Sequence, residues 1–181
     1  MTIESPERSL NTSSLYNSID SAYTVAPSLA RLSPETTDYG LLVLSHILDE
    51  TANILRVTIP PVEFFYDTSD KEELTLAEVR GTHGNNNLRL RIELGYFLEQ
   101  ADRLQGNNSA AVIQDLKETF GEEMYHVYVA QHYPHTHAIT QFANDISGAA
   151  YRKDRGEKAA KAFGYKYAEG VLSRRRLIKV A

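Results

Sequence analysis

The sequence predicts an α+β protein, because two strongly helical stretches flank one with strand periodicity. A Ser-Pro-Glu sequence at 33–35 supplies an N-cap, a proline for the first helical position and an acidic first turn. The apolar series that follows predicts a helix over 34–55. At 88–94, apolar residues alternate with charged ones, which is the period of a half-buried strand. An apolar stripe then predicts a long helix over 109–133.

Shorter signals complete the predicted order of elements. β-branched and aromatic residues after two prolines predict a strand near 62–66. The segments 76–80 and 88–94 flank a turn rich in Gly and Asn, so they are expected to form a hairpin. A short helical pattern predicts a helix near 95–105, and a longer one predicts a helix near 153–173.

The length and composition fit one globular domain. The chain has 181 residues, of which 42% are hydrophobic and 24% charged, so a folded core is expected. We expect a partly ordered N-terminal arm at 1–32, a single domain at 33–175 and a C-terminal tail at 176–181.

Charge and residue usage limit the classes of function. The net charge of −5 gives no general attraction to nucleic acid or acidic membranes, so neither is expected as a partner. The polar N-terminus and the lack of a long apolar run predict a cytoplasmic protein. Because the chain has no cysteine, disulfides and thiol chemistry are excluded, and histidine and carboxylate remain as the strong metal ligands.

One stretch of the long helix carries residues suited to metal chemistry. The sequence Glu-Glu-Met-Tyr-His at 122–126 differs by one residue from the H-E-x-x-H zinc helix. Residues four apart lie on one helical face, so Glu122 and His126 can point at a single ion. The simpler interpretation is a surface pair that contributes a few tenths of a kcal/mol to helix stability.

The order of elements and a second motif resemble the small zincin-like metallopeptidases. In the compact members of that family, a helix with a third ligand in a Glu-x-x-Ala-x-x-Phe context follows the H-E-x-x-H helix. Here that motif stands as Glu157, Ala160 and Phe163. The resemblance covers about residues 35–173. It implies a zincin-like fold, in which a small antiparallel or mixed sheet packs against the long motif-bearing helix and flanking helices.

The resemblance also implies roles for individual residues. Glu122, His126 and Glu157 would be the metal ligands, with Glu122 in place of the usual first histidine. Glu123 would be the general base that takes a proton from the attacking water. Zinc is the metal that the family implies, and two carboxylate ligands shift the preference toward manganese or iron. They also donate charge that works against hydrolysis at neutral pH. We therefore expect a divergent or degenerate metallopeptidase with weak or no peptide hydrolysis.

An alternative third ligand is His132, six residues after His126, as in the longer pattern H-E-x-x-H-x-x-G-x-x-H. That pattern needs a glycine to turn the chain, and this chain has Val129 there. Glu157 is therefore preferred over His132.

A peptide or protein is the expected partner. The strand at 88–94 is expected to form the edge beside the cleft, where the backbone of Leu88, Leu90 and Ile92 would bind an extended peptide. The alternative function is a non-enzymatic protein-interaction domain with no metal. Its contact surface would use tyrosines, which are common at interfaces and in cores: Tyr125, Tyr128, Tyr133, Tyr151, Tyr165 and Tyr167.

Overall fold

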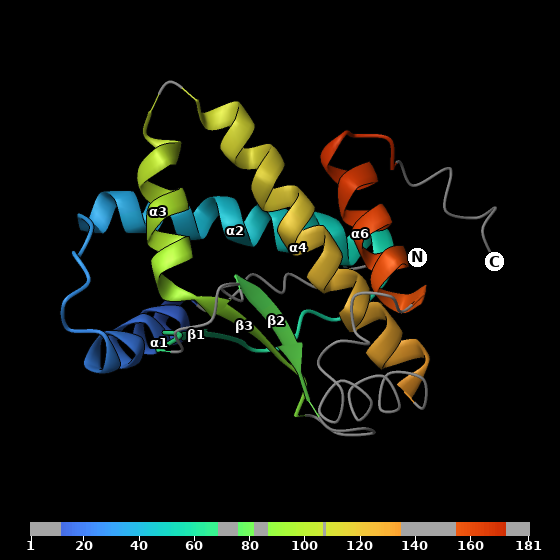
Figure 1. Ribbon diagram of the computed structural model, residues 1–181, viewed down its shortest axis with the longest axis horizontal. Helices are drawn as coiled ribbons and strands as arrows, with labels where there is room; N and C mark the ends of the chain where they lie inside the picture. The colour runs from blue at the N-terminus through green and yellow to red at the C-terminus, as the bar shows by residue number, and fades with distance from the viewer. Residues whose placement is uncertain (1–11, 69–75, 82–86, 107, 135–154, 173–181) are drawn as a thin grey trace, which may run out of the picture.

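The computed structural model describes residues 12–68, 76–81, 87–106, 108–134 and 155–172. In these ranges the chain forms five helices and a three-stranded sheet, which confirms the predicted α+β class (Figure 1). The elements are α1 (Thr12–Val25), α2 (Pro34–Leu55), β1 (Val62–Phe65), β2 (Ala77–Arg80), β3 (Arg89–Glu93), α3 (Leu94–Leu104), α4 (Ser109–His132) and α6 (Arg155–Ala168). None of these helices is long and apolar enough to cross a membrane.

Helix α2 has the predicted boundaries because its end signals are local. The Ser33 hydroxyl accepts a hydrogen bond from the backbone N–H of Thr36 at 3.2 Å, and Pro34 opens the helix. Arg56 then takes the left-handed conformation, with φ of 57°, and its N–H donates to Ala52 O. The face of α2 that carries Leu44, Leu48 and other apolar residues is buried in the core.

The sheet is mixed and has the strand order β1-β3-β2. β3 is parallel to β1 and antiparallel to β2, so the predicted hairpin of β2 and β3 is confirmed. Leu90 lies opposite Val62 on one side and Val79 on the other. The face that carries these three residues is buried, and its other buried members are Phe64, Ala77 and Ile92.

The expectation that the strand at 88–94 is a sheet edge is wrong. β3 is the central strand, and hydrogen bonds to β1 and β2 occupy both of its sides. The backbone of Leu90 and Ile92 is therefore not available to a peptide. Leu88 immediately precedes the strand. Helix α1 packs against β1 and covers its outer side. There the backbone N–H of Phe64 donates a hydrogen bond to the Ser18 hydroxyl at 2.7 Å. β2 is the other outer strand of this sheet, and it packs against α4.

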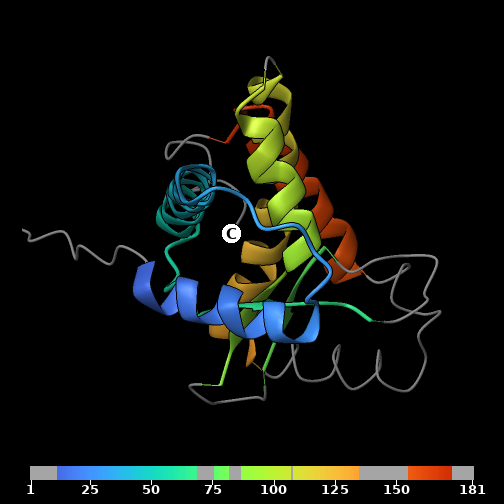
Figure 2. The same ribbon diagram turned by 90° about the vertical axis from the view of Figure 1, so that its left-hand side faces the viewer.

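The core also extends into the region expected to be a partly ordered arm. α1 buries Leu15, Ile19 and Ala22 in the same core as the later helices, and it lies along β1 (Figure 2). The domain therefore begins before the predicted boundary at residue 33. The predicted tail at 176–181 lies outside the described residues.

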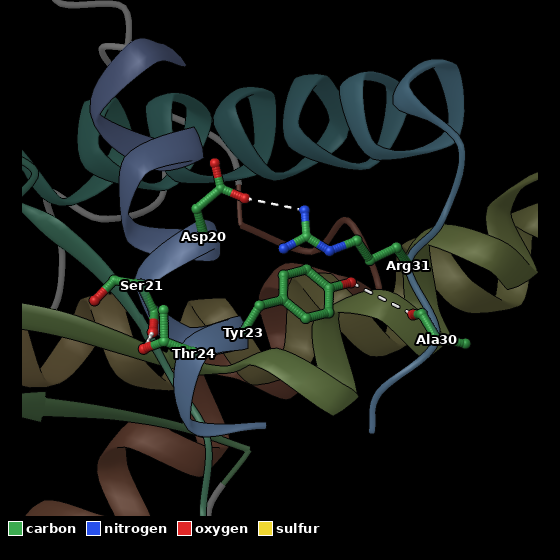
Figure 3. A network of polar contacts seen from close by, with 6 residues as sticks. All are labelled: Asp20, Ser21, Tyr23, Thr24, Ala30 and Arg31. Carbon is green, nitrogen blue, oxygen red and sulfur yellow. Dashed lines mark hydrogen bonds and ion pairs between the residues drawn. The ribbon is translucent and has the colours of Figure 1, made fainter. Parts of the chain in front are cut away.

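Polar contacts fasten the segment after α1 back onto that helix (Figure 3). The guanidinium of Arg31 lies 3.3 Å from a carboxylate oxygen of Asp20 and 4.4 Å from the ring centroid of Tyr23. The Tyr23 hydroxyl donates to the carbonyl oxygen of Ala30 at 3.4 Å. These contacts set the direction in which the chain enters α2.

Candidate metal centre

The site lies where α4 and α6 pack as an antiparallel pair (Figure 1). Two glycines allow the backbones to approach closely. A Cβ on Gly164 would lie 2.3 Å from the carbonyl oxygen of Glu118, and a Cβ on Gly121 would lie 3.0 Å from the Cα of Gly164. His126 lies on α4 after this contact, and Glu157 lies on α6 before it. Because the two helices are antiparallel, both residues are on the same side of the contact.

The structure brings together the three predicted metal ligands. Nε2 of His126 lies 3.3 Å from Oε2 of Glu157, and each of Glu122, His126 and Glu157 offers a ligand atom within 4.8 Å of the others. Glu157 is buried, and the other two are half-buried. Ligands about 2.1 Å from a tetrahedral ion lie roughly 3.4 Å apart, so the spacing suits an ion after small side-chain movements.

The electrostatics of the group favour a cation. Burial, together with the hydrogen bond and negative charge of Glu157, raises the pKa of Glu122 to about 7. Nε2 of His126 is buried and makes no hydrogen bond within the described part of the chain. A divalent ion would neutralise the crowded carboxylates and use this nitrogen as a ligand, so the donor set fits a metal.

Glu123 lies beside these ligands and faces the sheet. Burial raises the pKa of its carboxyl group well above the usual range, and the charges of Glu122 and Glu157 act in the same direction. A hydrogen bond to the backbone of Val79 in β2 has the opposite effect. Glu123 is therefore placed between the candidate ligands and β2.

The structure does not bring the alternative ligand His132 to the site. His132 is exposed at the end of α4, and its Nδ1 lies 3.2 Å from the carbonyl oxygen of Tyr128. α4 continues without a turn from His126 to His132, so the second ring lies about 9 Å further along the axis and about 120° around it. Val129 does not turn the chain as the glycine of the longer pattern would.

The described tyrosines differ in exposure, and the ring centroid of Tyr128 lies 6.0 Å from that of Tyr133. Tyr167 is buried, while Tyr133 and Tyr165 are 54% and 51% exposed. Tyr125 and Tyr128 are half-buried, with ring centroids 5.6 Å apart. Tyr151 lies outside the described residues.

Sequence reasoning missed three residues that shape this site. Gly121 and Gly164 set the approach of the helices, and Lys161 lies 3.3 Å from Oε1 of Glu157. Isolated glycines inside two helical patterns were a usable signal, because glycine in a helix interior often has a packing reason. Lys161 carried a weaker signal, its spacing of four residues after Glu157.

Comparisons of this chain with protein-family models, with curated proteins and with solved structures found no match.

Proposed function

We propose that this protein binds one divalent metal ion through Glu122, His126 and Glu157, as a divergent or degenerate zincin-like metallopeptidase. The proposal rests on the position of these three side chains in the fold. Side chains singled out by two separate sequence motifs meet at the contact between α4 and α6. The buried Nε2 of His126 supports a ligand role for this histidine.

The donor set indicates which metals to test. Two carboxylates and one imidazole suit zinc, manganese and iron, and the second carboxylate favours the harder ions of this group. A bound divalent ion would supply a Lewis acid that polarises a peptide carbonyl. The two anionic ligands would weaken that polarisation, so we expect slow hydrolysis or none.

The proposed peptide-binding strand is β2. It is an outer strand of the described sheet and packs against the metal-site helix, whereas β3 is central. An extended peptide that pairs with β2 would have to displace the carboxyl group of Glu123 from the Val79 backbone, and it would then lie beside that carboxyl group. Glu123 would then hold or accept a proton next to the peptide.

Elemental analysis after equilibrium dialysis against trace zinc, manganese and iron(II) tests metal binding. We expect near-stoichiometric metal in the wild type and in His132→Ala, and loss of metal in His126→Ala and Glu157→Gln. His132→Ala is the matched control because it removes an imidazole from the same helix. A metal-free wild type overturns the proposal, and metal loss in the control overturns the ligand assignment.

Hydrolysis is tested on the metal-loaded protein with an unfolded protein substrate. If the protein is a peptidase, Glu123→Gln retains the metal and loses activity. A metal-loaded wild type that cleaves nothing is the degenerate, peptide-binding relative, and a direct peptide-binding measurement then tests the remaining part of the proposal.

A further inference from the structure

The two oxygens of the Glu157 carboxylate have different partners. Oε2 lies 3.3 Å from Nε2 of His126, on the side of the candidate ligands. Oε1 lies 3.3 Å from Nζ of Lys161, one helical turn further along α6. The carboxylate is thus placed between the candidate metal position and a lysine ammonium.

Lys161 also acts on the second carboxylate of the site. Its positive charge lowers the pKa of Glu122, in opposition to burial and to Glu157. The lysine side chain is 59% exposed, whereas that of Glu157 is 6% exposed. The ammonium group therefore reaches from solvent to a buried anion, and its charge influences both carboxylates of the candidate site.

We propose that Lys161 is a resident counter-ion of the metal centre, which makes metal binding weaker than the same three ligands would give without the lysine charge. This inference rests on the proposed function of the site. The ammonium competes with the metal for the negative charge of Glu157 and Glu122. Its contact with Oε1 also leaves Oε2 as the oxygen that faces the other ligands, so Glu157 would bind the ion through one oxygen.

The expected effect follows from simple electrostatics. A unit charge and a divalent ion roughly 5 Å apart in water repel each other, and at physiological ionic strength this repulsion corresponds to about a fivefold change in affinity. Removal of the lysine charge should therefore tighten binding. If Lys161 only orients Glu157, its removal should instead weaken metal binding, because the Glu157 carboxylate would no longer be held in place.

Calorimetric titration of Mn²⁺ and Zn²⁺ into folded variants separates these possibilities. We expect Lys161→Gln to bind about fivefold more tightly than the wild type, and Lys161→Arg, which keeps the charge, to bind as the wild type does. Lys166→Gln is the matched control, since it removes an exposed lysine of the same helix away from Glu157. Circular dichroism and urea unfolding show whether each variant is folded.

The outcomes distinguish this inference from the proposed function. Metal binding that requires His126 but is unchanged or weaker in Lys161→Gln overturns the counter-ion role and leaves the site intact. Equal tightening in Lys166→Gln also overturns it, because the effect is then one of net charge. Absence of binding in the wild type and in every lysine variant overturns the metal site itself.

Discussion

Gly164 lies against the backbone of Glu118 so closely that a Cβ at position 164 would be 2.3 Å from the Glu118 carbonyl oxygen. The same Cβ would lie 3.0 Å from the backbone nitrogen of Glu122, a candidate ligand. The neighbouring atoms belong to the backbone, so they cannot move aside as a flexible side chain can. The separation of α4 and α6, and with it the separation of the ligands, therefore depends on a missing methyl group.

Gly164→Ala should destabilise the protein and disturb the metal site. Forcing a methyl group into a packed contact costs about 1–3 kcal/mol, and this clash is with backbone. We expect a loss of about 2–3 kcal/mol in urea unfolding and at least tenfold weaker metal binding. Gly106→Ala is the control, because a Cβ at position 106 would come no closer than 3.3 Å to its nearest neighbour, the carbonyl oxygen of Arg103. If Gly164→Ala is as stable as the control, the close contact does not set the helix separation.

The elements that the sequence predicted well have local causes. α2 starts at Pro34 and ends at Leu55 as expected, because the Ser33 cap and the apolar period lie within the helix itself. The pairing of β3 with β1 is parallel and joins strands distant in sequence. No local pattern in 88–94 encodes that partner, so the strand was wrongly placed at an edge.

The site likewise has some features that local sequence predicts and others that depend on tertiary packing. Glu122 and His126 could be paired from helical periodicity, and Glu157 was found through the motif that resembles a metallopeptidase helix. The roles of Gly164 and Lys161 depend on how two helices cross. Residue spacing within one helix carries no information about that crossing.

Glu50→Gln should lower the free energy of unfolding at neutral pH. The free energy of unfolding of the variant should also fall less than that of the wild type as the pH is lowered. Burial raises the pKa of Glu50, but hydrogen bonds from Tyr167 at 2.7 Å and Lys117 outweigh burial and hold the pKa below its usual value of 4.5. A lowered native pKa stabilises the folded state above the unfolded pKa, and this contribution is lost as the pH falls through the native pKa.

Urea unfolding of wild type and Glu50→Gln between pH 7 and pH 3 tests this. We expect a difference of about 1 kcal/mol at pH 7, reduced by solvent screening because Glu50 is 41% exposed. The difference should shrink as the pH falls below 4.5. Tyr167→Phe should reduce the acid dependence in part. A difference that is constant over this pH range contradicts the assignment.

Tyr16→Phe should lower stability at neutral pH and lose this effect at alkaline pH. Burial and the hydrogen bond that Tyr16 donates to Asp38 at 2.5 Å raise the pKa of this phenol to about 12. A raised native pKa stabilises the folded state below the unfolded pKa, near 10, and the stabilisation is lost as the pH rises toward 12.

Unfolding at pH 8 should show Tyr16→Phe to be about 1 kcal/mol less stable than the wild type. At pH 11 the difference should be smaller, and ultraviolet titration should show one fewer late-ionising phenol in the variant. Tyr39→Phe, at an exposed position next to Asp38, is the control and should leave the free energy of unfolding unchanged. Equal losses at both pH values would show that packing, and not the phenol proton, is responsible.

Substitutions of Glu123 separate its contact with the sheet from a role in chemistry. Its carboxyl group is hydrogen-bonded to the backbone of Val79 in β2, and glutamine can keep an acceptor there while alanine cannot. Because an unsatisfied buried N–H costs about 1–3 kcal/mol, we expect Glu123→Ala to unfold at a lower urea concentration than Glu123→Gln. Both variants should retain the metal, since Glu123 is not among the three ligands.

Hydrolysis then decides the catalytic role. If Glu123 is the general base, both variants lose activity although only the alanine variant loses stability, because glutamine cannot accept the proton. Activity that falls only in Glu123→Ala would instead show that Glu123 holds β2 against α4 and takes no part in proton transfer. The glutamine variant is therefore the informative one, since it separates the hydrogen bond from the charge at a single position.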